Sequence, residues 1–318
     1  MAPTVDVVII TYRRPDVVRT NLEHLSSQTV KPRQVIIVDS SPDDLTKIVV
    51  EEFDFASFLK NPAGAGNMTS SRNEALPLLL SEVVCFLDDD AFPGHRYVEA
   101  ISDFYSANPA AQLGCARTLN GVPNEDEIGL ESIGRALEDG TLLGFFGADP
   151  GKDQPIDHGI GATMHMRRKL LVELRGFREY YTGVSGVRED ADLFMRAASL
   201  GHQAWFVHRA VAHHVAAPQA RGQRFDRRYR HWASRNHTIL VAANHGMFTR
   251  GGIRQLTAPT RHALREPGTP AKKVGRAAVI ATGTVRGLAE SLRLFGIGPQ
   301  EAIGGYRKAG RPMVLPPA

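Results

Sequence analysis

The chain has 318 residues, of which 42% are hydrophobic and 23% charged, enough for one large or two smaller soluble domains. A formal net charge of +4 is only mildly basic and does not by itself indicate a nucleic-acid partner. Two cysteines, Cys85 and Cys115, are too few for a disulfide framework, and no apolar run approaches the ~20 residues of a membrane span. We therefore expect a cytoplasmic protein, with peripheral contact at the inner face of a membrane left open.

The first eighty residues alternate between strand and helix patterns. Residues 5–10, 35–38 and 55–59 are apolar runs typical of buried strands. A glycine-containing loop over 61–74 then leads into a predicted helix over 75–80. This alternation predicts βαβ units and a parallel sheet, in which ligands bind beyond the carboxyl ends of the strands.

The next strand ends in three adjacent carboxylates. Residues 83–87 are apolar, and Asp88, Asp89 and Asp90 follow directly. Like charges at a strand end repel one another, and burying them unpaired is costly. Mg²⁺ or Mn²⁺ would resolve this, because both take oxygen ligands and are often shared with substrate phosphates. The triplet therefore indicates a metal–diphosphate site for a nucleotide-activated substrate, the alternative being a solvated acidic turn.

Two earlier strand ends are also polar, with Thr11 and Tyr12 after the first strand and Asp39 and Ser40 after the second. Three polar ends at one edge of a parallel sheet are consistent with one site. A conventional dinucleotide site would need a glycine-rich G-x-G-x-x-G turn after the first strand, and that position reads TYRRPD. We therefore exclude a conventional dinucleotide site of the dehydrogenase type.

The second half carries a further acidic pair. A strand is predicted over 161–166 and a helix over 168–174. Glu189 and Asp190 then stand at the start of a predicted helix, where the helix dipole favours carboxylates, so a simple capping role is the alternative. A strand over 203–207 precedes two adjacent histidines, and helices are predicted over 229–236 and 239–243.

The chain beyond Gly251 is a separate segment. Residues 261–270 are polar and turn-like, and 277–295 form an amphipathic helix interrupted by charges. A helical lid, a homodimer interface and a membrane-surface contact all remain open for this segment.

Four segments together carry a family resemblance: VVIITYRRP, the second strand with its polar end over 35–44, the pair SSRNEAL and VCFLDDDAFP, and REDADLFMRA. In this order they resemble the family 2 glycosyltransferases. The resemblance implies a GT-A fold, an α/β nucleotide-binding sandwich with a mostly parallel central sheet, here followed by a helical C-terminal segment. It implies a glycosyltransferase domain over 1–245, with a nucleotide-binding half over about 1–115 and an acceptor-binding half over about 116–245. Residues 246–318 form the helical extension.

The resemblance also implies roles for individual residues. Asp90 would hold the metal, with His213 as a further ligand and His214 as its competitor. Asp190 would be the catalytic base, with Glu189 as the alternative. The residues assigned to the nucleotide are Thr11, Tyr12, Arg14, Asp39, Arg72, Asn73, Asp88 and Asp89.

The implied activity is that of an inverting, Mn²⁺- or Mg²⁺-dependent hexosyltransferase. It would move a sugar from a nucleotide-diphosphate sugar to a hydroxyl of a glycan, a lipid-linked saccharide or a natural product. UDP is the first expectation, with dTDP and GDP open, since Asp39-Ser40-Ser41 replaces the frequent D-G-S of the family and Glu74 stands where glycine is common. The alternatives are a sugar-1-phosphate nucleotidyltransferase and a non-catalytic nucleotide-sugar-binding protein.

Overall fold

The structure is a computed structural model that describes residues 2–183, 187–215 and 226–303. Its strands are β1 Val5–Thr11, β2 Gln34–Asp39, β3 Ala56–Lys60, β4 Val83–Asp88, β5 Ala91–Pro93, β6 Leu113–Leu119, β7 Arg135–Ala136, β8 Leu142–Leu143, β9 Gln154–Ile156, β10 Met164–Arg167 and β11 Ala204–His214. Its α-helices are α1 Pro15–Ser26, α2 Leu45–Val50, α3 Met68–Ala75, α4 Tyr97–Ala107, α5 Arg168–Glu173, α6 Glu189–Ser199, α7 Arg227–His245, α8 Arg250–Arg265 and α9 Pro270–Phe295. Short 3₁₀ helices cover Leu76–Leu78, Leu130–Ser132 and Gly161–Thr163.

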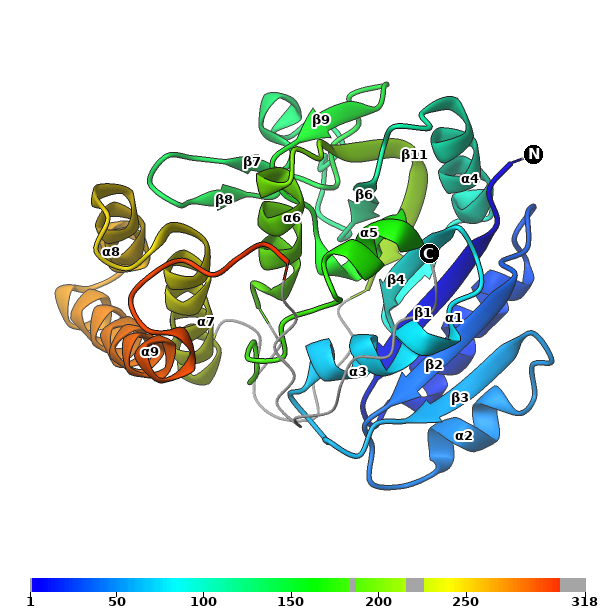
Figure 1. Cartoon of the computed structure of the whole chain (residues 1–318), viewed down its shortest axis with the longest axis horizontal. Coiled ribbons are helices and arrows are strands. Elements are labelled where there is room, and N and C mark those ends of the chain that lie inside the picture. The colour runs from blue at the N-terminus through cyan, green and yellow to red at the C-terminus, as the bar shows by residue number, and fades with distance from the viewer. Residues whose placement is uncertain (1, 184–186, 216–225, 304–318) are drawn as a thin grey trace.

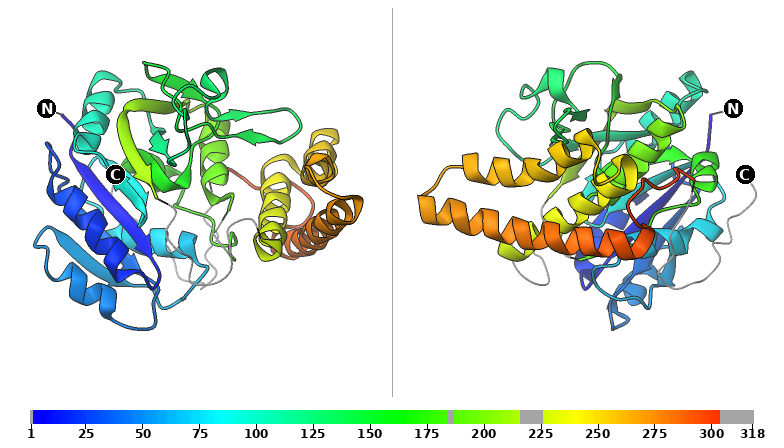
Figure 2. Two further views of the ribbon diagram at one scale, coloured as in Figure 1. Left: turned by 180° about the vertical axis from the view of Figure 1, so that it is seen from behind. Right: turned by 60° about the vertical axis from the view of Figure 1, so that its left-hand side comes forward.

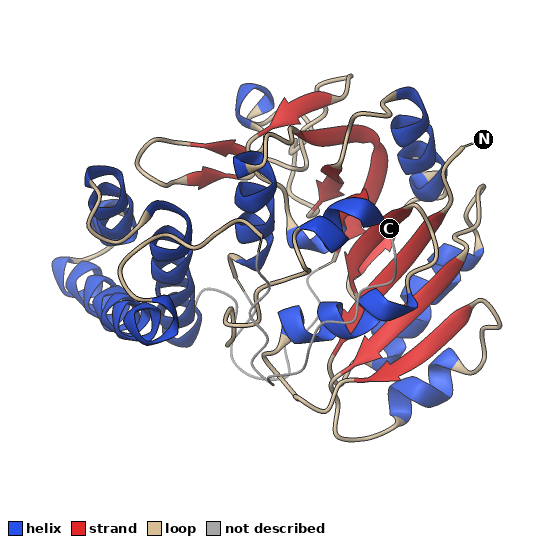
Figure 3. Ribbon diagram, viewed as in Figure 1, coloured by secondary structure: helices blue, strands red, loops and turns tan. Residues whose placement is uncertain are grey.

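One large sheet organises the molecule, with strand order β3-β2-β1-β4-β10-β6-β11-β5 and with β9 paired to β11 (Figure 1). β1 to β4 pair in parallel, and β10 runs antiparallel between β4 and β6. Helices cover both faces of the sheet (Figure 3). The predicted α/β sandwich is confirmed.

The apolar strands are buried on both faces, as parallel sheets require. Along β1, Val8 and Ile10 join the core beneath α3, α5 and α6, while Val7 and Ile9 join the core beneath α1, α2 and α4. The predicted helix over 75–80 is displaced, because α3 begins at Met68 and gives way to a 3₁₀ turn at Leu76.

The strand register places the polar strand ends together. Thr11 lies opposite Asp39 on β2, and Ile10 lies opposite Asp88 on β4. The three polar ends expected from the sequence therefore do share one edge of the sheet.

β11 is longer than the sequence suggested. It continues past a register shift between Val207 and Val211 and pairs in parallel with β6 and antiparallel with β5. In this register His214 lies opposite Ala91, the residue after the acid triplet. The extension therefore carries the histidine pair to the acidic edge.

The C-terminal helices form a unit beside the sheet, with α8 and α9 running side by side away from it (Figure 2). The two helices predicted over 229–236 and 239–243 are one helix, α7. α9 packs closely on α7, because a Cβ at Gly283 or Gly287 would meet α7 atoms well inside contact distance. The turn predicted over 261–270 is wrong for its first half, which belongs to α8.

The chain returns from α9 to the neighbourhood of α6. Arg178 and Arg196 donate to the backbone carbonyls of Glu301 and Ala302, and this anchors the segment after α9 near α6. Residues 304–318 of the expected extension lie outside the described residues. In the described part of the chain, none of the helices combines the length and apolarity needed to cross a membrane.

Candidate active site

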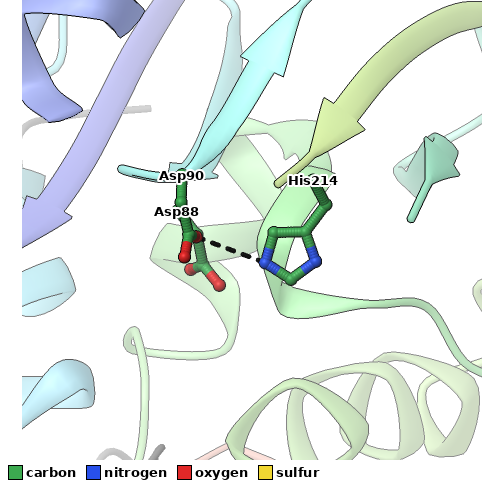
Figure 4. Close-up of side chains that lie close together, drawn as sticks. All are labelled: Asp88, Asp90 and His214. Atoms are coloured by element: carbon green, nitrogen blue, oxygen red, sulfur yellow. Dashed lines mark ion pairs between the residues drawn. The ribbon is translucent and has the colours of Figure 1, made fainter. Parts of the chain in front are cut away.

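Two carboxylates and one imidazole converge at the end of β4. Figure 4 shows Asp88 and Asp90 with their carboxylates turned toward His214 at the end of β11. One ligand atom from each residue lies within 4.8 Å of the other two, and Asp90 Oδ1 is 3.2 Å from His214 Nε2. Oxygen and imidazole donors at this spacing suit Mn²⁺ or Mg²⁺, with imidazole favouring Mn²⁺.

Asp88 supplies a second sign of a cation site. Its Oδ1 atom is buried and accepts no hydrogen bond from the described residues, although Arg72 Nη2 lies 3.5 Å away. Burial raises the pKa of Asp88, and the Arg72 charge offsets only part of that effect. A buried carboxylate oxygen without a donor is stabilised by a metal ion, so the residues present fit the predicted group.

The placement of the two histidines corrects the expectation for His213. Side chains alternate along a strand, so neighbours point to opposite faces. His213 is exposed, whereas His214 is 8% exposed and lies beside Asp90. His214, not His213, is therefore the candidate metal ligand.

Asp89 occupies a different environment from its two neighbours. It accepts a hydrogen bond from Thr11 Oγ1 at 2.6 Å and pairs with Arg14 Nη2 at 2.6 Å. Burial raises the pKa of Asp89 to about 7, against the opposing effect of Arg14. Arg14 also contacts Asp90 Oδ2 at 3.0 Å, so one guanidinium links two acids of the triplet. The nucleotide contacts were expected from Thr11, Arg14 and Asp89. In the structure these three side chains contact one another.

Asn21 fixes the backbone beneath the triplet. Its side-chain amide donates to the carbonyls of Asp88, Asp89 and Ala91 at 3.3, 3.1 and 3.0 Å. This residue was not predicted from the sequence. A signal was present, because Asn21 lies on the face of α1 that is otherwise apolar and buried.

Asp39 has one carboxylate oxygen that is bonded and one that is not. Its Oδ1 atom accepts hydrogen bonds from the backbone N–H and the hydroxyl of Ser41, at 2.9 and 2.5 Å. Its Oδ2 atom is buried and has no hydrogen-bond partner among the described residues. Tyr12 is only partly buried at the same edge, with the Arg13 guanidinium 5.5 Å from its ring. Tyr12 and Asp39 therefore lie at the same edge of the sheet, and the base contact expected of them stays a prediction.

Asn73 does not face this edge. It is fully buried, and its amide exchanges hydrogen bonds with both backbone groups of Phe177 at 2.8 Å and donates to Glu179 at 2.9 Å. A side chain whose donors and acceptors are used in the core has no surface for a ligand. The nucleotide contact expected of Asn73 is therefore corrected to a structural contact.

Arg72 joins the two halves of the site. It is 1% exposed, and its guanidinium lies 2.9 Å from Glu189 Oε1 and 3.5 Å from Asp88 Oδ1. Instead of the expected contact near the nucleotide, it connects the acid triplet to the start of α6. A buried arginine between two carboxylates holds their spacing, because each pair would leave an unpaired buried charge if broken.

Glu189 and Asp190 differ in burial and in their bonding partners. Glu189 is buried and bonded to Arg72, and burial together with the neighbouring Asp190 charge raises its pKa to about 8. Asp190 is only partly buried and is oriented by the backbone N–H groups of Gly161, at 2.9 Å, and Ala191, at 2.7 Å. The Gly161 contact was not predicted from the sequence. Of the two carboxylates, Asp190 is the more exposed.

The similarity to known proteins agrees with this geometry. Residues 6–175 match the sequence profile described as Glycosyl transferase family 2. The chain belongs to glycosyl transferase family 2. The match includes the acid triplet and ends before Asp190 and His214, so these two residues of the glycosyltransferase are placed by the structure rather than by the profile.

The structure of this glycosyltransferase is also similar to that of the mannosyltransferase PcManGT from Pyrobaculum calidifontis, solved in complex with GDP-Man and Mn²⁺. The two share 19% sequence identity with a TM-score of 0.52, over 92% of this chain and 76% of that chain. This likeness supports the predicted GT-A fold. A search among curated proteins gave no match.

Proposed function

We propose that this glycosyltransferase moves a hexosyl group from a nucleotide-diphosphate sugar to an acceptor hydroxyl, with inversion at the anomeric carbon. The observation that supports this most directly is the convergence of Asp88, Asp90 and His214 at the strand edge where the nucleotide would lie. These three residues would hold Mn²⁺ or Mg²⁺. When bound, the cation would act as a Lewis acid on the departing diphosphate.

Asp190 is the proposed general base. The acceptor oxygen forms a bond to the anomeric carbon while its proton passes to Asp190, and the bond from that carbon to the diphosphate oxygen breaks. The products are the glycosylated acceptor and a nucleoside diphosphate. The backbone N–H groups of Gly161 and Ala191 hold the carboxylate in place for this transfer. Attack from the side opposite the leaving group requires no covalent sugar–enzyme intermediate.

The contacts of Asp39 favour a pyrimidine nucleotide. Only its Oδ2 atom lacks a partner among the described residues, because Oδ1 already accepts two hydrogen bonds from Ser41. One such oxygen matches the single imide N–H of uracil or thymine. Guanine offers two adjacent N–H donors and would use both oxygens of a carboxylate. We therefore place UDP first and dTDP second, and GDP, the nucleotide of the similar mannosyltransferase, third.

A donor panel tests this function. Purified protein is incubated with UDP-, dTDP- and GDP-sugars and Mn²⁺ or Mg²⁺, and the released product is identified. Nucleoside diphosphate, lost on chelation of the metal, is the expected product. Pyrophosphate would instead identify a nucleotidyltransferase. Donor binding without turnover for any acceptor would favour a binding protein, and absence of binding by every donor would refute the proposal.

The helical extension has the composition of a surface-binding element. Residues 246–303 contain nine Lys or Arg and three Glu, and Ile253, Val274 and Val285 are each more than half exposed. Basic and apolar side chains together favour the surface of an anionic membrane. We propose that contact, with no spanning helix involved. Co-sedimentation with phosphatidylglycerol vesicles should exceed that with phosphatidylcholine vesicles and weaken in high salt, and equal binding to both would contradict it.

A further inference from the structure

Arg188 is a partly buried arginine whose side chain has no counter-charge. Among the residues that the structure describes, none forms a hydrogen bond or ion pair with its guanidinium, and its Nε atom is fully buried without an acceptor. Burial lowers the pKa of Arg188, since the charged form is desolvated there. Its backbone is left-handed, with φ of 85°, a conformation that is costly for a residue with a side chain.

The nearby acids are already engaged. Glu189 is bonded to Arg72, and Asp190 accepts from the backbone N–H groups of Gly161 and Ala191. Both lie close enough to influence the pKa of Arg188 but beyond ion-pair distance. The segments outside the described residues, 184–186, 216–225 and 304–318, contain no Asp or Glu. An acidic side chain of this chain is therefore not at hand to neutralise Arg188.

The other groups around Arg188 belong to the acceptor half. Its charge contributes to lowering the pKa of His158 and of His237, in each case after the larger effect of burial. Tyr229 on α7 also lies close enough to influence the pKa of Arg188. By contrast, the positive charges that act most strongly on Asp88 are Arg72, His214 and Arg14, not Arg188. The unpaired guanidinium therefore lies on the side of the proposed base rather than at the metal end.

We propose that Arg188 binds an anionic group of the acceptor, a phosphate or a carboxylate, next to the hydroxyl that Asp190 deprotonates. This rests on the proposed function, because it assumes that Asp190 faces an acceptor. An arginine fork matches the planar or tetrahedral oxygens of these groups and forms charge-assisted hydrogen bonds with them. Arg188 would thereby select charged acceptors over neutral ones.

The test compares Arg188→Gln and Arg188→Lys with Arg228→Gln, a change at an exposed arginine on α7. The probes are matched pairs, glucose 6-phosphate or glucuronate against glucose, titrated by calorimetry. Binding of UDP and GDP with Mn²⁺ is measured on the same samples. We expect Arg188→Gln to weaken binding of the anionic probes roughly 10- to 100-fold, as expected for the loss of charge-assisted hydrogen bonds. Arg188→Lys should retain part of the affinity, and nucleotide binding should not change.

The outcomes distinguish an anion of the acceptor from the donor diphosphate, and they distinguish failure of the Arg188 proposal from failure of the proposed function. An equal loss of nucleotide affinity would place the donor diphosphate on Arg188 and overturn the acceptor assignment. The proposal would also be overturned if the wild-type protein bound glucose as tightly as glucose 6-phosphate and glucuronate, or if it bound none of these three probes. Nucleotide and Mn²⁺ binding report on the proposed function independently. A purely structural role predicts a lower Tm for Arg188→Gln, whereas removal of an unpaired buried charge should leave Tm unchanged or raised.

Discussion

Replacement of Asp190 by Asn separates the proposed base from its neighbour. The substitution keeps the size of the side chain and removes its negative charge. The lost general base should lower turnover roughly 10²- to 10⁴-fold, or about 3–5 kcal/mol in the activation barrier. The substitution should destabilise the folded protein by less than it raises the activation barrier. Asn retains one acceptor for the N–H groups of Gly161 and Ala191, so about one hydrogen bond is lost, worth roughly 1 kcal/mol at a partly exposed site.

Steady-state release of nucleoside diphosphate measures this effect, with calorimetric binding of nucleotide and Mn²⁺ as the control. Asp190→Asn should bind nucleotide normally and turn over slowly. Glu189→Gln is the matched variant, and it acts differently because it removes the negative charge beside Arg72 while its amide oxygen can still accept a hydrogen bond from that arginine. Its main signature should be a lower Tm, because the buried Arg72 charge loses part of its compensation.

Two results would refute this reasoning. Turnover of Asp190→Asn within about threefold of wild type is far less than a missing base costs and would exclude Asp190. Loss of activity in Glu189→Gln without a change in Tm would instead make Glu189 the base.

Two further predictions follow from the placement of buried histidines. His214→Ala should weaken Mn²⁺ binding by at least about tenfold, since even the loss of an outer-shell partner of a metal ligand costs that much, whereas His213→Ala should leave the affinity unchanged. Mn²⁺ titration followed by electron paramagnetic resonance measures both affinities. A larger loss in His213→Ala than in His214→Ala would contradict the assignment. Burial lowers the pKa of His165 from 6.5 to about 3, so the folded state holds its proton less tightly than the unfolded state. The stability that the neutral ring contributes is complete above pH 6.5 and is lost as the pH falls toward 3, by about 2 kcal/mol at pH ~5. Urea unfolding should show that the free energy of unfolding depends less on pH in His165→Gln than in the wild type. An unchanged pH dependence would mean that other groups cause it.

The edge of the sheet that carries the acid triplet could be predicted because its signals are local. An apolar strand followed by acids fixes both the direction and the end of β4, and the parallel order brings neighbouring strand ends together. The choice between His213 and His214 could not be made this way. It depends on a register shift between Val207 and Val211 in β11, where three residues have no counterpart on β6, and an odd number of extra residues moves the opposite side chain to the site.

Tertiary contacts decided the other differences. The role of Asn73 is set by Phe177 and Glu179, about a hundred residues later in the chain, which no local pattern reveals. α8 contains Gly251, Gly252 and Pro259, residues that disfavour helix, and forms nonetheless because it packs against α9.

The arrangement of the acid triplet explains how three neighbouring carboxylates coexist. Asp89 is held by Thr11 and Arg14, and its raised pKa lets it share a proton near neutral pH. Asp88 and Asp90 remain, and the arginines beside them are already shared, Arg14 with Asp89 and Arg72 with the carboxylate of α6. Asp88, Asp90 and His214 therefore have ligand atoms within 4.8 Å of one another at this edge. A divalent cation held there would attract the negatively charged diphosphate of a donor, so we expect donor binding to depend on metal.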